Sequence, residues 1–284
     1  LGAGIYGYSA FRIVPFLILA LVILWLARVI QLRAEIGRYI GNSALMFAMA
    51  LVIAMPLLRY ATEQPKQIAA PMAYLIDPGA AGADNPLTTL GLNLVNVAAM
   101  FNWTGDANPL NAVPNDPALD YVTGALFLLG VAYALYRLVR FRESVYAFLL
   151  IGLATLILPS ALNLAHPAEN PSIVRAAGAI PFAIIIAALP LAWVIQSIRT
   201  ALSDSVVSRI VAVVIVSIVL LVSLRANYLR YFHDYAFVNQ ERASNTFAIA
   251  RSSVFDSPRV DQESAILNQK SEFLNEYERG TESY

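Results

Sequence analysis

Charged residues are absent from six long stretches of the chain, each 15 to 25 residues long, at 13–27, 39–58, 121–136, 144–168, 176–198 and 210–224. A helix of roughly 20 apolar residues crosses the hydrocarbon core of a bilayer. Arginines that flank the shorter stretches can extend outward and keep their charge out of the hydrocarbon. The pattern therefore predicts an all-α, polytopic transmembrane helical bundle in residues 1–224, with spans at about 11–30, 41–60, 119–137, 144–164, 175–197 and 209–226.

Two longer segments lie outside these spans: a loop at 60–118 and a tail at 225–284. In the loop, Asn85 is a suitable helix cap before Pro86, and apolar residues then recur at spacings of three and four, at Leu87, Leu90, Leu94, Val97 and Phe101. We expect an amphipathic helix that covers the bundle as a lid or lies in the membrane interface, with Asn93 and Asn96 on other faces. Helically spaced aromatics in the tail predict a helical extension with interfacial anchors.

The positions of basic residues predict the orientation. The short loops 28–38, 137–143 and 199–209 hold eight arginines, whereas the short segments at the opposite end hold four basic residues among several acidic ones. Lysine and arginine near helix ends stay on the cytoplasmic side. We therefore expect both termini, the long loop and the tail to face outward.

Composition narrows the chemistry. Hydrophobic residues make up 58% of the chain, and 19 basic residues balance 19 acidic ones, so nothing indicates a nucleic-acid partner. The absence of cysteine excludes disulfides and thiolate chemistry, and His166 and His233 are the only histidines. We expect no metal site and no cofactor, and we expect membrane lipids as partners. Because the chain begins at Leu1 without an initiator methionine, we interpret it as part of a longer protein.

Two arginines mark similar helix entrances at the predicted outer face. Arg12 precedes Pro15 at the start of the first span, and Arg175 precedes Pro181 at the start of the fifth. A guanidinium at headgroup depth can donate two parallel hydrogen bonds to a phosphate, and a helix N-terminus adds partial positive charge. The simpler alternative is that each arginine only anchors its helix to lipid headgroups.

Other polar residues lie in the same outward segments. His166 and Glu169 occupy the loop before the fifth span, and Asp106 and Asn108 occupy a turn-rich loop before the third. Together with Tyr8 they are candidates for contacts with a polar ligand. For Asp106 and Asn108, local turns that satisfy backbone donors are the simpler interpretation, and for His166 and Glu169 it is plain solvation.

Three motifs occur in order between these spans. They are Tyr-x-Tyr-x-x-x-Arg-x-x-Pro from Tyr6, Met-Phe-Asn-x-x-Gly-Asp-x-Asn-Pro from Met100, followed by Pro-x-x-Pro and Leu-Phe-Leu-Leu-Gly, and Arg-Ala-x-Gly-Ala-Ile-Pro from Arg175. With them the chain resembles, over most of residues 1–240, bacterial integral-membrane glycosyltransferases of the C superfamily. These are related to protein O-mannosyltransferases and to the aminoarabinose transferase of lipid A.

The resemblance implies an inverting enzyme of the bacterial inner membrane with its active face outward. It would transfer a sugar from a polyprenyl-phosphate donor to a lipid, glycan or protein acceptor. The acidic base of such enzymes lies in their first outward loop, which is expected upstream of Leu1, so no catalytic residue is assigned here. Arg175, and second Arg12, match by position an arginine that would bind the donor phosphate. On this resemblance, the candidates for contacts with the sugar or the acceptor are His166, Glu169, Asp106, Asn108 and Tyr8.

Two other classes of function remain open on the sequence. A transporter or flippase of a lipid-linked saccharide would share the outward arginines, but such proteins commonly carry charged or broken helices at mid-membrane. The spans predicted here lack central charges. A non-catalytic anchor or scaffold for an outer domain is the third possibility.

Overall fold

Long apolar helices dominate the computed structural model, which describes residues 1–31, 36–67, 85–203 and 205–236. Six of them are long and apolar enough to cross a membrane, and the described residues contain no strand. The helices are α1 (Val14–Gln31), α2 (Ile36–Glu63), α5 (Tyr121–Phe141), α6 (Ser144–Ala161), α7 (Ile180–Ala201) and α8 (Val206–Leu229). The prediction of an all-helical, polytopic bundle is confirmed, and the chain is an integral membrane protein.

Shorter elements complete the chain. Two 3₁₀ turns, η1 (Gly4–Tyr6) and η2 (Ser9–Ile13), lead into α1, and η4 (Pro167–Glu169) and η5 (Ala177–Ala179) lie between α6 and α7. The helix α4 (Pro86–Ala99) lies outside the six spans, and a π-helical segment, η6 (Arg230–Tyr235), follows α8. Leu1–Tyr231 form one compact unit, and most of the predicted tail lies outside the described residues.

The centre of the bundle is built from α5, α6 and α7. In the most apolar stretch of each of these spans 22% of the residues are buried, against 6% in α2 and 11% in α8. α5 and α7 approach each other closely at Gly130 of α5, where an added Cβ would lie 2.0 Å from the backbone oxygen of Ile186 in α7. A glycine is required there because the two backbones touch. The outer helices expose their apolar side chains, as expected for surfaces that face lipid.

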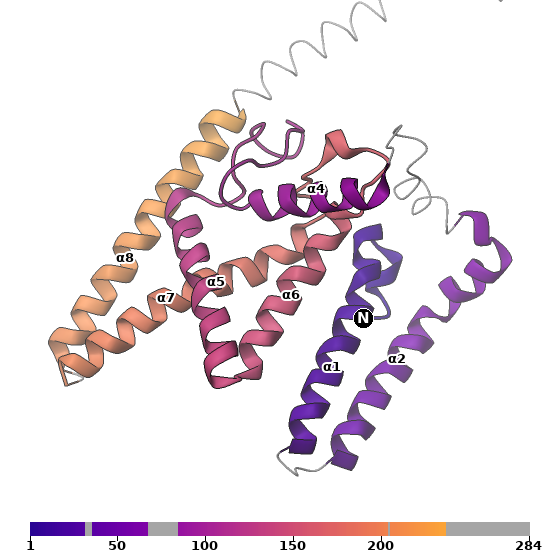
Figure 1. Cartoon of the computed structure of the whole chain (residues 1–284), viewed down its shortest axis with the longest axis horizontal. Coiled ribbons are helices and arrows are strands. Elements are labelled where there is room, and N and C mark those ends of the chain that lie inside the picture. The colour runs from indigo at the N-terminus through magenta and orange to yellow at the C-terminus, as the bar shows by residue number, and fades with distance from the viewer. Residues whose placement is uncertain (32–35, 68–84, 204, 237–284) are drawn as a thin grey trace, which may run out of the picture. The chain divides into compact units, whose positions relative to one another are not determined.

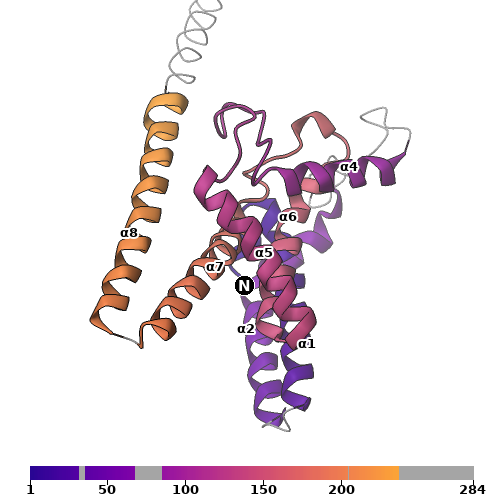
Figure 2. The same cartoon turned by 60° about the vertical axis from the view of Figure 1, so that its left-hand side comes forward.

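α1 and α2 form an antiparallel pair beside α6 (Figures 1 and 2). The hydroxyl of Tyr6 inserts into the hydrogen-bond ladder of α2, donating to the Ile53 oxygen at 2.8 Å and accepting from the Leu57 nitrogen at 3.3 Å. This insertion lies next to Pro56, which lacks an N–H group. Proline and an inserted side chain are the usual causes of a local break in a helix.

The α5–α6 hairpin turns sharply at Arg142, whose φ is 54°. Arg137 closes this hairpin: its guanidinium pairs with Glu143, donates to the Tyr133 hydroxyl and lies over the Tyr146 ring. These contacts combine charge, hydrogen bonding and cation–π attraction. We therefore assign Arg137 a structural role at the arginine-rich end of the bundle.

Candidate functional site

α4 lies across the end of α6 and is held there by one buried amide (Figures 1 and 2). Asn93, only 1% exposed, donates from Nδ2 to the backbone oxygens of Ala161 at 3.0 Å and Asn163 at 3.1 Å. The last carbonyls of a helix have no partner within the helix, so a donor is needed at this position. Asn93 therefore faces the bundle although it is polar.

This arrangement corrects part of the predicted face of α4. Val97 and Phe101 are buried and Leu90 packs against the core, as expected. Leu87 is 78% exposed and Leu94 is also exposed, however, whereas Asn93 lies inside. The periodicity of apolar residues alone could not reveal that the surface below α4 is the polar end of another helix. α4 begins as predicted, because the Asn85 side chain accepts from two backbone N–H groups of the first turn and Pro86 occupies the first helical position.

The loop between α6 and α7 folds back on the same end of α6. Asn170 donates from Nδ2 to the Ser160 oxygen at 2.9 Å, and the Ser160 hydroxyl accepts from the Ser172 nitrogen at 2.8 Å. Asn163 is fully buried and donates from Nδ2 to the His166 backbone oxygen at 3.0 Å. Side-chain amides and hydroxyls thus satisfy the end of α6 and fix the loop that carries the predicted site residues.

Arg175 and Glu169 are brought together in this loop. Arg175 Nη2 donates to Glu169 Oε2 at 2.8 Å, and the arginine side chain is 20% exposed against 58% for the glutamate. Asn163 Nδ2 lies 3.5 Å from the same carboxylate oxygen. The arginine lies two residues before η5, and therefore at the entrance to the fifth span.

The carboxylate of Glu169 is stabilised in its charged form. The hydrogen bond from Arg175 lowers the pKa of Glu169 below its ordinary value, burial opposes this effect, and the charges of Arg175 and His166 add to the lowering. Glu169 is therefore ionised at neutral pH. It holds one edge of the guanidinium and leaves the other available.

Several polar atoms around this loop are buried without a hydrogen-bond partner among the residues that the structure describes. They are Arg175 Nη1, Asn163 Oδ1, Asn170 Oδ1 and, on the neighbouring loop, Asn102 Oδ1. Most buried polar groups in proteins are hydrogen-bonded, so a group of unsatisfied atoms marks a place for water, an ion or a polar ligand. Here the unsatisfied donor belongs to a permanent cation.

The remaining predicted site residues are distributed differently. Arg12 lies in η2, and the 3₁₀ turns at the two entrances, η2 and η5, both pack against α6. Tyr8 precedes η2 and is 53% exposed. In this entrance the aromatic with a defined structural partner is Tyr6, which the sequence did not single out.

The carboxylate of Asp106 is buried and hydrogen-bonded within the protein. The residue is 3% exposed, and its two carboxylate oxygens accept from the Asn108 nitrogen at 2.8 Å, the Asn111 amide at 2.8 Å and the Ile173 nitrogen at 3.0 Å. Asn108 is exposed and accepts from the Leu110 nitrogen in a local turn. The bonds to Asn108 and Asn111 are the local turn contacts that the simpler interpretation expected. The bond from Ile173, which ties the loop after α4 to the loop before α7, was not predicted.

A second buried carboxylate, not predicted from the sequence, joins α5 to α8. Asp120 Oδ2 accepts from the hydroxyls of Thr123 at 2.6 Å and Ser223 at 2.7 Å and from the Asn227 amide at 3.0 Å. Nearby, Asp116 pairs with Arg230 at 2.6 Å. Burial raises the pKa of Asp120, but the hydrogen bonds outweigh it and the pKa lies below its ordinary value. We call this set of contacts the α5–α8 latch.

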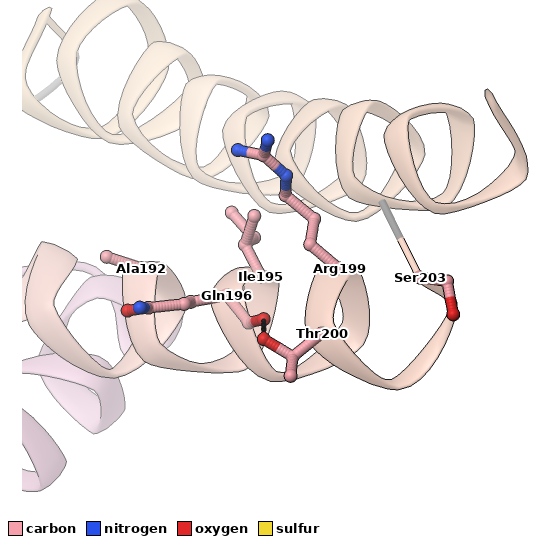
Figure 3. Close-up of a pocket in the computed structure, with 6 residues that line it drawn as sticks. All are labelled: Ala192, Ile195, Gln196, Arg199, Thr200 and Ser203. Atoms are coloured by element: carbon pink, nitrogen blue, oxygen red, sulfur yellow. Dashed lines mark hydrogen bonds between the residues drawn. The ribbon is translucent and has the colours of Figure 1, made fainter. Parts of the chain in front are cut away.

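No group of three or more potential metal ligands of the His, Asp and Glu types occurs among the described residues. An open groove of about 780 Å³ lies along the last turns of α7, at the opposite end of this helix from Arg175 (Figure 3). The Arg175 loop and this groove are therefore separate features.

Comparisons of the chain with models of protein families, with curated proteins and with solved structures gave no match. The resemblance to membrane glycosyltransferases thus stays a prediction.

Proposed function

We propose that the chain belongs to a membrane glycosyltransferase that takes a sugar from a polyprenyl-phosphate donor, and that Arg175 binds the donor phosphate. The observation that carries this proposal is the unsatisfied, buried Nη1 of Arg175 at the entrance to a membrane span. A guanidinium at that depth meets the phosphate of a lipid whose polyprenyl chain lies in the hydrocarbon. Its planar fork suits phosphate oxygens better than a point charge does.

The proposed chemistry gives Arg175 a role in the transition state. The bond between the anomeric carbon and the phosphate oxygen breaks while a bond from the acceptor oxygen to that carbon forms. The acceptor proton passes to a carboxylate base, and polyprenyl phosphate leaves with increased negative charge. A fixed cation stabilises this charge more in the transition state than in the ground state, which accelerates the reaction.

Glu169 acts in this proposal as a positioning residue. Its ion pair fixes the plane of the guanidinium and so directs Nη1 toward the ligand. It also prevents the arginine from extending to lipid headgroups, which distinguishes the site from a simple anchor. Asn163 and Asn170 supply neutral amide oxygens that can accept from sugar hydroxyls without repelling the phosphate.

Transfer measured on the complete protein tests the proposal. Membranes are given a polyprenyl-phosphate donor with a radiolabelled sugar, and both cleavage of the sugar–phosphate bond and movement of intact donor across the membrane are followed. We expect cleavage with the native residue and at least a tenfold loss in Arg175→Ala, in line with one charge-assisted hydrogen bond.

Arg59→Ala is the matched control, because Arg59 is highly exposed and pairs with Glu63 one turn away. Movement of intact donor without cleavage would identify a transporter. Full transfer by a folded Arg175→Ala protein would refute the role of Arg175.

A further inference from the structure

α7 and α8 touch near the turn that joins them and then diverge (Figures 1 and 2). The buried residues of α8 are Ser208 and Ala212, both in its first two turns. Farther along, α8 exposes Val213, Val214 and Ile218. In a bilayer, such exposed apolar surfaces must be covered by lipid or by another helix.

The groove at this junction has a polar end and an apolar wall. It is lined by Ala192, Ile195, Gln196, Arg199, Thr200 and Ser203. Figure 3 shows Arg199 and Ile195 extending from α7 toward α8, whereas Thr200 turns away and donates to the Gln196 backbone oxygen at 2.9 Å. Of these lining residues, Arg199 alone is charged. The groove therefore offers a cation near the helix end and, beside it, aliphatic surface toward the membrane interior.

The surrounding charge favours an anion. The three short loops at this end of the bundle contain eight arginines against three acidic residues, and Glu143 among the latter is already paired with Arg137. Basic grooves between membrane helices bind the headgroups of anionic lipids. We propose that this groove, which is formed by the last turns of α7 and the turn that leads to α8, binds an anionic phospholipid, with its phosphate at Arg199 and an acyl chain along Ile195 and Ala192.

This lipid site is independent of the proposed catalytic function, because it lies in the last turns of α7 whereas Arg175 precedes its first turn. The occupant is a phospholipid rather than a soluble phosphate, because a soluble phosphate would leave the apolar wall of the groove uncovered. An arginine that only anchors its helix contacts many headgroups in turn. Arg199 lies beside an apolar groove, so we expect it to hold one lipid at a defined position.

Native mass spectrometry of the detergent-purified protein, titrated with phosphatidylglycerol, phosphatidylcholine or glycerol phosphate, tests this proposal. We expect tight binding of one phosphatidylglycerol, weaker binding of phosphatidylcholine and no retention of glycerol phosphate. Arg199→Gln should weaken the phosphatidylglycerol complex about tenfold, through loss of a charge-assisted hydrogen bond. Arg28→Gln, in the last turn of α1, is the matched control and should leave it unchanged.

A second variant tests the apolar part of the site without altering charge. Ala192→Phe should fill the wall of the groove and also weaken phosphatidylglycerol binding. The proposal is overturned if Arg199→Gln binds phosphatidylglycerol as tightly as the native protein, or if Arg28→Gln weakens that binding as much as Arg199→Gln does. It is also overturned if Ala192→Phe binds phosphatidylglycerol unchanged, or if the native protein retains glycerol phosphate.

Discussion

Four polar side chains illustrate how burial and partners separate structural from functional roles. Asp106 and Asp120 are each 3% exposed and accept several hydrogen bonds from the protein, so their charges are fully used within the fold. Arg175 has one nitrogen paired with Glu169 and another buried without a partner. A buried donor on a permanent cation is costly unless a ligand or water satisfies it. This contrast makes Arg175, and not the buried aspartates, the residue to test for ligand binding.

At the same scale, Asp120→Asn should weaken the α5–α8 latch. The pKa of Asp120 lies below its ordinary value of 3.8, so its carboxylate stabilises the fold above that pH, and this contribution is lost as the pH falls through the lowered pKa. We expect a destabilisation of about 1–3 kcal/mol at neutral pH. Unfolding temperatures in detergent should show a gap between the native protein and the variant that narrows on acidification. The exposed substitution Glu63→Gln serves as the control, and a gap independent of pH would contradict this assignment.

At the scale of elements, α4 shows where sequence patterns succeed and where they fail. Asn85 and Pro86 predicted the start of the helix because capping is a local interaction. The inward position of Asn93 was not predictable, because it depends on the free carbonyls at the end of α6, some seventy residues away in the chain. The only signal was an uncharged amide within an apolar segment, and such a residue fits a solvent-facing position equally well.

Asn93→Ala should loosen α4 from α6, because the Ala161 and Asn163 carbonyls would lose their buried donor. Hydrogen exchange, followed by mass spectrometry, should quicken by about tenfold or more across α4 and stay unchanged in α7. Asn96→Ala is the matched control, since Asn96 lies on the same helix but is exposed. Equal exchange in the two variants would show that the Asn93 amide does not hold α4.

At the scale of the whole molecule, the sequence predicted all six spans. Charged side chains are costly in hydrocarbon, so a membrane-spanning helix appears in the sequence as a long uncharged stretch. The sequence predicted that Arg175 lies at the entrance to the fifth span, but it did not predict the contacts that Arg175 makes there. Its ion pair with Glu169 and its surrounding asparagines depend on the way α6 ends. The outward orientation of the Arg175 loop, and the sugar-transfer activity, remain predictions.

Direct binding of a long-chain polyprenyl phosphate to the detergent-purified protein tests the central claim most directly, with the uncharged polyprenol as the matched ligand. If Arg175 recognises the phosphate, the native protein binds the phosphate form more tightly, Arg175→Ala reduces that preference about tenfold or more, and Arg175→Lys restores only part of it because the fork is lost. Arg59→Ala should bind like the native protein. Equal affinity for the two lipids in the native protein, or an unchanged preference in a folded Arg175→Ala variant, would contradict the account.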